Sequence, residues 1–312
     1  MIQKFDHRAN PTSPMKIQTL QALIHVEALG SIRAAAQEVA LSQPALTAAI
    51  QQLEEELQAP LLVRTRQGAT LTPFGRAFMG RARLIVAESQ RAKDEIAQLR
   101  GNWEGSVRFS TSPAVALSIL PLALQQFAHA HPQVQVHVRD GLYPGITTAL
   151  RDGTLDFGLT PVTHRTLEED LVAEPLFTSE IVIACQRDHR LRAATRIAEL
   201  TECEWVFSSA PRGPGALIDE AFASVGLGTP RCGIVCESFL ALPGIVARSS
   251  MMATIPRMVF ETSGFRPELC RVPVTDRLPC PTVSVVRRHD LPLTPAASNL
   301  TGWIRHYALK GG

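Results

Sequence analysis

The sequence has no apolar run close to the roughly 20 residues that a membrane-spanning helix requires, so no transmembrane segment is predicted. Its first residues, MIQKFDHRANPTSP, also lack the hydrophobic core of a secretory signal. We therefore expect a protein that stays in the cytoplasm, with either Met1 or Met15 as its start. The 45% of hydrophobic residues can form packed cores, and 312 residues predict two or three domains.

Motifs of catalytic and metal sites are missing too. The chain contains no Gly-rich phosphate loop, HExxH, GxSxG or paired CxxC, so we predict neither an enzyme nor a cofactor. Its 6 cysteines all lie in the second half, and Cys232 and Cys236 have no companion pair to complete a zinc site. We expect most of these cysteines to be buried, reduced thiols. His129, His131 and His137 have no cysteine or carboxylate at ligand spacing and are interpreted as surface residues.

Acidic residues are absent from one stretch, residues 61–87, although the whole chain carries a net charge of only +2. The same stretch contains several arginines. Such a local excess of positive charge is typical of a surface that meets phosphate. The arginines are Arg64, Arg66, Arg76, Arg81 and Arg83.

The segment Ser42–Leu57, SQPALTAAIQQLEEEL, is predicted to be a helix with two different faces. Its apolar residues recur at helical spacing, and Ser42 is an N-cap residue with Pro44 in the first turn. Gln43, Thr47 and Gln51 form an uncharged face, whose amides and hydroxyl suit the edges of DNA bases. The alternative is an ordinary amphipathic surface helix. The flanking segments decide between this interpretation and a DNA-reading helix.

Those flanks favour DNA binding. Residues 16–29 predict a helix that ends at Gly30, and Ser31 caps a second short helix, followed by a tight turn into Ser42–Leu57. Two short helices joined in this way form a helix-turn-helix. The segment LLVRTRQGATLT that follows predicts a hairpin wing carrying Arg64 and Arg66.

The stretch SIRAAAQEVALSQPALTAAIQQLEEELQAPLLVRTRQGATLTPFG resembles the N-terminal signature of the LysR-type transcriptional regulators. Three positions matter for contacts: Gln58 and Gln67 replace the usual Gly and Arg, and Ala48 stands where the family is often polar. The resemblance implies a homodimer, and with it a tetramer, that binds a dyad-symmetric site in double-stranded DNA; RNA polymerase is a further partner. The DNA-binding residues that we predict are Ser31, Ser42, Gln43, Pro44, Thr47, Gln51, Arg64 and Arg66.

A long helix is predicted over residues 73–100. Apolar and small residues recur in steps of four and three along it, which is the spacing of a heptad seam. A helix packed on its own domain is the alternative, but a dimerisation helix suits a paired DNA-binding head better. The seam consists of Phe78, Ala82, Ile85, Ser89, Ala92, Ile96 and Leu99.

Strand and helix patterns alternate from residue 105 onward, which predicts parallel sheets covered on both faces. Two such runs indicate two α/β lobes resembling periplasmic solute-binding proteins, and an α+β fold class overall. A solute-binding protein is the competing interpretation for this half alone. The predicted domains are a disordered tail (1–14), a winged helix-turn-helix (15–72), a linker helix (73–100) and an effector-binding domain (105–312), with lobe I at about 105–178 and 285–312 and lobe II at about 179–284.

Small hydroxyl side chains follow several of the predicted strands, where ligands of open α/β sheets bind. Each could simply cap a helix, but several of them meeting in one cleft would hold a small anion. Tyr143 and Phe239 would then cover an aromatic ring, so a small aromatic acid is the predicted effector. The predicted effector-binding residues are Ser110, Thr111, Ser112, Tyr143, Thr160, Pro161, Ser208, Ser209 and Phe239.

Three further stretches, SSAPRGPG, CESFLALPG and RRHDLPLTPAA, resemble a branch of the LysR-type family that regulates toluenesulfonate degradation. That resemblance implies an aromatic sulfonate or carboxylate as the effector and a role in the catabolism of aromatic compounds.

Overall fold

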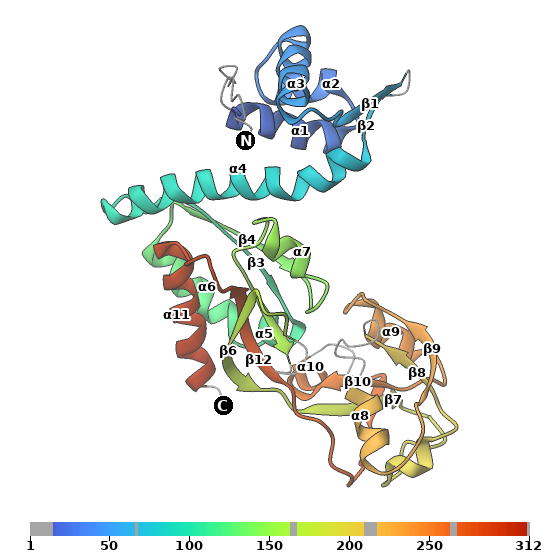
Figure 1. Cartoon of the computed structure of the whole chain (residues 1–312). Helices are drawn as coiled ribbons and strands as arrows, with labels where there is room; N and C mark the ends of the chain where they lie inside the picture. Colours follow the sequence, from blue (N-terminus) through green and yellow to red (C-terminus); the bar gives the residue numbers. More distant parts are fainter. Residues whose placement is uncertain (1–14, 66–67, 163–166, 209–216, 263–266, 311–312) are drawn as a thin grey trace, which may run out of the picture. The chain divides into compact units, whose positions relative to one another are not determined.

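A computed structural model describes residues 15–65, 68–162, 167–208, 217–262 and 267–310 (Figure 1). The described residues fall into two compact units: those within 1–93 and 151–154, and those within 94–150 and 155–312. The predicted tail, 1–14, lies outside the described residues. Within the described ranges, no helix is both long and apolar enough to cross a membrane.

The first unit contains the predicted helix-turn-helix. Gly30, at φ +64°, ends the first helix in the left-handed conformation that glycine favours. The hydroxyls of Ser31 and Ser42 cap the next two helices by accepting the N–H of Ala34 and Ala45, both at 3.3 Å. The prediction of capped helices is therefore confirmed. The helices are α1 (Ile17–Leu29), α2 (Ile32–Glu38) and α3 (Gln43–Leu57).

The wing consists of two antiparallel strands, β1 (Leu62–Thr65) and β2 (Gly68–Leu71). It packs closely on the turn after α1, where the Ala69 N–H donates to the Gly30 carbonyl at 2.8 Å. Gly68 has φ +138°, and a Cβ there would lie 2.3 Å from that same carbonyl oxygen. Glycine is therefore required at the start of β2.

Helix α4 (Pro73–Leu99) follows the wing and extends from the first unit into the second. Its predicted seam divides into two parts. Ala82 is fully buried in the core of the helix-turn-helix and Phe78 packs against that core, while Ile85, Ile96 and Leu99 are 42%, 58% and 69% exposed. The first seam positions thus belong to the core of the helix-turn-helix, and the later apolar ones remain exposed in this chain.

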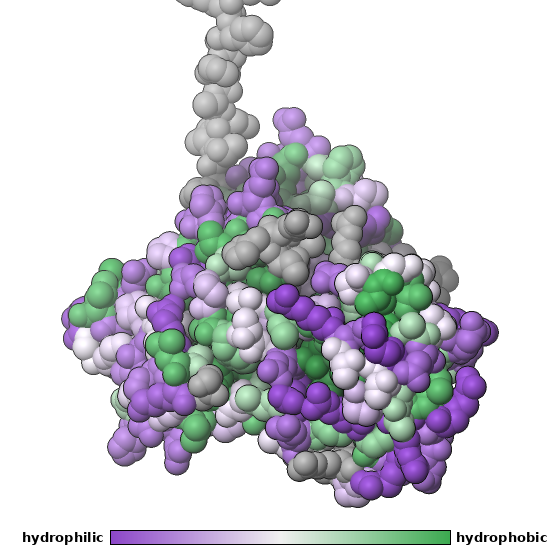
Figure 2. Space-filling view, turned by 90° about the horizontal axis from the view of Figure 1, so that it is seen from below, coloured by the Kyte–Doolittle hydropathy of each residue, from purple (hydrophilic) through white to green (hydrophobic). Residues whose placement is uncertain are grey.

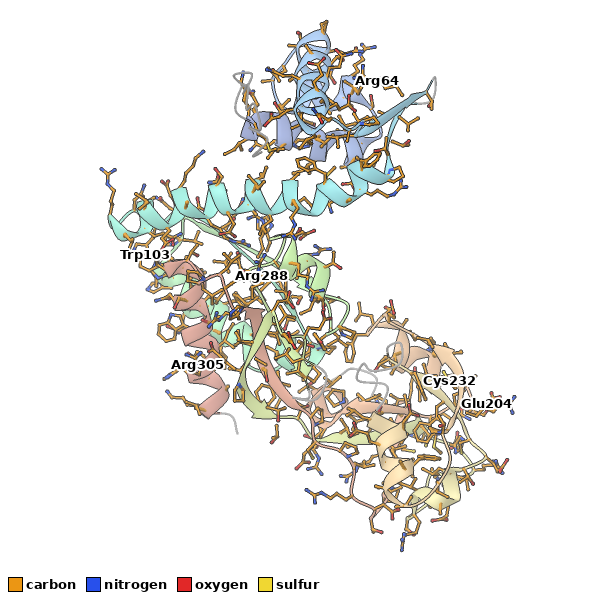
Figure 3. The ribbon with its side chains drawn as sticks, viewed as in Figure 1. Arg64, Trp103, Glu204, Cys232, Arg288 and Arg305 are labelled. Atoms are coloured by element: carbon orange, nitrogen blue, oxygen red, sulfur yellow. The ribbon has the colours of Figure 1, made fainter. Side chains whose placement is uncertain are left out.

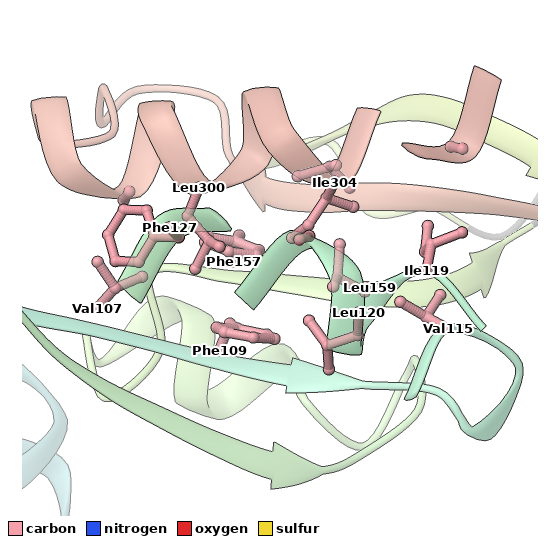
Figure 4. Close-up of a cluster of buried hydrophobic side chains, with 14 of the residues drawn as sticks. Val107, Phe109, Val115, Ile119, Leu120, Phe127, Phe157, Leu159, Leu300 and Ile304 are labelled. Atoms are coloured by element: carbon pink, nitrogen blue, oxygen red, sulfur yellow. The ribbon is translucent and has the colours of Figure 1, made fainter. Parts of the chain in front are cut away.

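The second unit begins with a sheet in the order β4-β3-β5-β12-β6. Helices α6 and α11 lie side by side on one face, over a core that includes Phe109, Phe157 and Leu300 (Figures 1 and 4). Helix α7 packs on the opposite face, so the adjacent residues Val285 and Val286 enter different cores. The elements are β3 (Gly105–Thr111), α5 (Pro113–Ala116), α6 (Leu120–Ala130), β4 (Val134–Asp140), α7 (Thr147–Arg151), β5 (Phe157–Val162), β6 (Leu171–Thr178), β12 (Thr282–Arg288) and α11 (Pro295–Lys310).

The expectation of purely parallel sheets was wrong. Strand β12 runs antiparallel to both β5 and β6, while β3, β4 and β5 are parallel. The chain leaves this lobe after β6 and re-enters it before β12 at the same end of the sheet, where the Ser179 N–H donates to the Pro281 carbonyl at 2.9 Å. A strand that enters from that end must run in the opposite direction. Strand β6 and helix α10 were not predicted.

The other lobe contains a sheet in the order β10-β7-β11, which is antiparallel, and a parallel pair, β8-β9. Trp205 on β8 is fully buried and bridges to Met252, next to β10, which joins the two sheets. The elements are β7 (Ile181–Gln186), η1 (Ile197–Leu200), β8 (Glu204–Phe207), α8 (Leu217–Ser224), β9 (Arg231–Val235), α9 (Ala241–Ala247), β10 (Ala253–Pro256), α10 (Arg257–Thr262) and β11 (Leu269–Arg271).

The end of α3 gives a stability prediction. Gln58 caps this helix at φ +50°, a left-handed conformation that is costly for a residue with a Cβ. Gln58→Gly should stabilise the head by about 0.5–1 kcal/mol after the greater backbone freedom of glycine is subtracted. Amide exchange in peptides from α3 should slow by about two- to fivefold.

The matched control is Gln52→Gly, an exposed position inside the same helix, which should cost about 1 kcal/mol and speed exchange. Faster exchange in both variants would mean that the left-handed cap carries no strain.

Candidate functional site

The outer face of α3 carries the side chains that were predicted to contact bases. Gln43 and Gln51 are exposed and Thr47 is half-buried, whereas Leu46 and Ile50 on the opposite face are fully buried. Pro44 is exposed in the first turn. This face presents two amides and a hydroxyl, groups that can both donate and accept hydrogen bonds. It can therefore pair with base edges in a major groove.

The predicted serines have a structural task as well. Ser31 and Ser42 accept the cap hydrogen bonds of α2 and α3, which uses one lone pair of each hydroxyl. The hydroxyl proton stays available as a donor. Each serine can thus cap its helix and still donate to a phosphate at the helix start.

The arginines of residues 61–87 differ in what they contact. Arg64 is exposed on β1 of the wing (Figure 3), and Arg81 is exposed on α4. Arg76 is exposed and donates to the Leu71 carbonyl at 2.9 Å. Arg83 instead pairs with Glu27 and lies 3.5 Å from the Asp152 carboxylate, so its charge is used inside the first unit. Arg66 lies outside the described residues.

A cavity of about 60 Å³ lies between the two lobes of the second unit. Hydroxyls reach it from both lobes and from the crossing between them: Ser112, Ser179, Ser208 and Thr254. The other lining residues are apolar, and no charged side chain is among the described residues that line it. They are Pro113, Ala114, Leu142, Pro161, Ile181, Leu217, Phe239, Leu242, Ile255, Pro256, Pro281 and Val283.

The structure brings part of the predicted effector site to this cavity. Ser112, Pro161, Ser208 and Phe239 line it. Ser209 lies outside the described residues. Ser179 and Thr254, which sequence reasoning missed, also line it, because the crossing segment and β10 reach the cavity only through the tertiary fold.

The other predicted effector residues lie elsewhere. Thr160 is fully buried and its Oγ1 accepts the Tyr143 N–H at 3.0 Å. Tyr143 is 5% exposed and packs in the core beneath α7 rather than on the cavity wall, so the structure does not place it over a ligand ring. Ser110 and Thr111 are buried as well, within or beside β3.

Ser112 is the polar group that stands out at the cavity. Its hydroxyl oxygen is buried, and the described residues offer it no hydrogen-bond partner. Its backbone N–H is already used by the Leu159 carbonyl at 2.7 Å, so the side chain is held at the wall. Ser110 also has a buried hydroxyl without a partner among the described residues, but that oxygen lies near Gly158. A buried polar atom of this kind is costly unless a ligand or water satisfies it.

Hydrophobic side chains on the face in Figure 2 are scattered among hydrophilic ones, as far as the coloured residues show. Isolated apolar residues of this kind are ordinary on a protein surface. The apolar lining gathered at the cavity is therefore the better indication of a ligand site.

Cysteines and histidines give no indication of metal chemistry. The described residues contain no group of three or more side chains that could hold a metal ion. Burial, which we expected of most of the thiols, is found for Cys185, Cys203 and Cys236, while Cys270 is half-buried and Cys232 and Cys280 are exposed.

The closest pair of thiols is Cys185 and Cys270, whose sulfur atoms are 3.4 Å apart across neighbouring strands. Burial raises the pKa of the Cys185 thiol, so it stays protonated at neutral pH. Among the histidines, His131 is half-buried and stacks on Trp103, with ring centroids 3.8 Å apart. Its role is packing.

Two family descriptions match the chain: "Bacterial regulatory helix-turn-helix protein, lysR family" over residues 17–76, and "LysR substrate binding domain" over residues 100–308. Among curated proteins, the chain is 27% identical to the HTH-type transcriptional regulator GalR of Pseudomonas putida, covering 96% of this chain and 75% of that protein. It is 30% identical to the SDS degradation transcriptional activation protein of a Pseudomonas species, covering 76% and 78%.

Solved structures of low identity share the fold. Full-length CbnR complexed with its target DNA matches with a TM-score of 0.69 at 21% identity, covering 94% of this chain and 99% of that one. Full-length BenM matches with a TM-score of 0.55 at 22% identity, covering 95% and 97%. Because the two family descriptions together span nearly the whole described chain, the protein belongs to the LysR family of DNA-binding transcriptional regulators, with a helix-turn-helix head and a substrate-binding domain.

Proposed function

We propose that this regulator reads a dyad-symmetric promoter site with Gln43, Thr47 and Gln51, and that a small aromatic acid in the interlobe cavity modulates that binding. The observation that carries the effector proposal is the buried Ser112 hydroxyl, which has no partner among the described residues and lies on the wall of a largely apolar cavity. A ligand held by both lobes shifts their relative orientation, because it favours the closed arrangement. The proposed place of action is the cytoplasm, and RNA polymerase is the proposed partner at the promoter.

The ligand that suits the cavity best is a small apolar molecule with one acidic group. Phe239, Leu217 and Val283 can cover a ring, while the hydroxyls of Ser112 and Ser208 can donate to a carboxylate or sulfonate. The relative named for SDS degradation is concerned with a molecule of the same design, an apolar chain ending in a sulfate. The resemblance to the toluenesulfonate branch supports an aromatic version of it.

Base reading is tested by Thr47→Ala and Gln43→Ala. Each should cost about 1–3 kcal/mol at the specific site, because a base-directed hydrogen bond is lost, and much less on unrelated DNA. Gel-shift titrations with DNA from upstream of the protein's own gene and with mixed-sequence DNA measure both quantities.

The control is Gln52→Ala, an exposed amide on the same helix that lies outside the predicted face. Equal losses on both DNAs for the two test variants would exclude base reading by these residues.

Self-association is proposed to use the exposed apolar residues of α4. Ile85 and Ile96 are 42% and 58% exposed, and in a symmetric dimer they would be covered by a second copy of the helix. Ile85→Asp with Ile96→Asp should dissociate that dimer, since carboxylates would be buried without partners. Sedimentation velocity measures the assembly size of the variant beside wild type, including the tetramer.

Arg100→Asp, which adds a carboxylate just beyond the helix, should leave the assembly unchanged. An unchanged size for the double isoleucine variant would place the interface on another surface.

The effector site is tested by Ser112→Ala, which removes the unpartnered hydroxyl. Calorimetric titration with benzoate, salicylate and toluenesulfonate should give binding to wild type and about tenfold weaker binding to the variant, the loss of about 1.4 kcal/mol typical of a hydrogen bond to a charged group. Binding to DNA without effector should not change.

Ser110→Ala is the matched control, because it also removes a buried hydroxyl that has no partner in the described part of the chain, but Ser110 lies away from the cavity wall. The proposal fails if none of these acids binds wild type, if a neutral or cationic compound binds tightly instead, or if both serine variants lose affinity equally.

A further inference from the structure

The DNA-reading face of α3 ends in an acid. Gln43, Thr47 and Gln51 are spaced four residues apart, and Glu54 follows three residues later on the same side of the helix. A carboxylate that faced the DNA would repel its phosphates. The position of Glu54 therefore calls for another explanation.

The side chain of Glu54 is directed at the root of the wing. Its Oε1 accepts two backbone hydrogen bonds, from the Leu61 N–H at 2.7 Å and the Leu62 N–H at 3.0 Å. Leu61 and Leu62 are 1% and 8% exposed, so both N–H groups need a partner within the protein. A charged acceptor makes these bonds stronger than neutral ones, and the carboxylate ties the last turn of α3 to the start of β1.

The same root is held from its other side by the start of α4. The Thr72 N–H donates to the Leu61 carbonyl at 2.9 Å, and the Thr72 hydroxyl donates to the Pro60 carbonyl at 2.6 Å. A Cβ on Gly75 would lie 2.2 Å from the Leu61 oxygen, so glycine allows this approach. Both backbone polar groups of Leu61 are thus engaged, its N–H by α3 and its carbonyl by the segment that begins α4.

We propose that Glu54 is a positioning residue for DNA binding: it fixes the wing relative to the reading helix, so that Arg64 reaches the DNA backbone when α3 occupies the major groove. Arg64 is exposed two residues after Leu62 on the same strand, and the direction in which it leaves the head is set at this root. The inference rests on the proposed contact between Arg64 and DNA.

The positioning role and simple charge repulsion predict opposite changes in DNA affinity when Glu54 is removed. Removal of an acidic side chain from a DNA-binding surface should, by charge alone, strengthen DNA binding. The control is Glu56→Ala, an exposed glutamate on the same helix, whose removal should strengthen DNA binding slightly or leave it unchanged. Glu54→Ala should instead weaken binding of the full chain to a mixed-sequence DNA duplex by about tenfold. It should also reduce the magnitude of the slope of log affinity against log salt by about 1, as Arg64→Ala should. This duplex suits the test because phosphate contacts do not depend on sequence.

Two further variants separate positioning from general damage to the fold. In an Arg64→Ala background, Glu54→Ala should cause little further loss of affinity or of salt slope, because the contact that it positions is already gone. Glu54→Gln keeps an oxygen acceptor and should recover most of the affinity; where circular dichroism shows that Glu54→Ala is unfolded, the pair Glu54→Gln and Glu56→Gln gives the comparison.

The proposal is overturned if Glu54→Ala binds as tightly as Glu56→Ala, if its loss adds fully to that of Arg64→Ala, or if its salt slope equals that of wild type. Failure of wild type to bind any duplex would be a different result, since it would contradict DNA binding by the chain as a whole.

Discussion

One backbone hydrogen bond joins the two crossings of the chain where they line the interlobe cavity. The Ser179 N–H and the Pro281 carbonyl, 2.9 Å apart, join the segment that leaves the first lobe to the segment that returns to it. Both crossings therefore lie at one end of the sheet, β12 has to run against its neighbours, and residues of both segments line the cavity. A ligand in that cavity would touch both lobes and the two crossing segments at once. This arrangement would let a small molecule bias the closure of the lobes.

Local chemistry made the head predictable from the sequence. Serine caps, a helix-ending glycine and helical spacing act over a few residues, so α1, α2 and α3 could be predicted before any tertiary contact was known. The charge pattern was less reliable. Arg83 was counted with the phosphate-binding arginines, but two carboxylates, those of Glu27 and Asp152, take up its charge, and this pairing joins residues far apart in the chain.

The cavity was only partly predictable for a related reason. A hydroxyl at the end of a strand is visible in the sequence, but the side on which it emerges depends on where the strand stops. Strand β3 ends at Thr111, so Ser112 reaches the cavity, while Ser110 stays within the sheet beside Gly158 of the neighbouring strand β5. Tyr143 was misplaced because an aromatic residue after a strand can equally well fill a core, and here it does. Ser179 and Thr254 carry no local signal, since only the paired crossings bring them to the same place.

The helix-turn-helix unit and the second unit each hold a buried or half-buried polar side chain at a fixed place, and the two differ in whether it has a partner. In the head, the Glu54 carboxylate is satisfied by two N–H groups at the wing root. In the cavity, the Ser112 hydroxyl lacks a partner among the described residues and is free to meet a ligand. A buried polar group whose hydrogen bonds are made holds the surrounding surface in one shape. A buried polar group without a hydrogen-bond partner favours binding of a molecule that supplies one.

The central claim is that a ligand bound between the lobes alters how the paired heads contact DNA. Hydroxyl-radical footprinting of the promoter complex, with and without an acid that calorimetry has shown to bind, tests it most directly. The protected positions of the two half-sites should remain, while the protection between or beside them should change in extent. Identical footprints with the cavity empty and filled would contradict it.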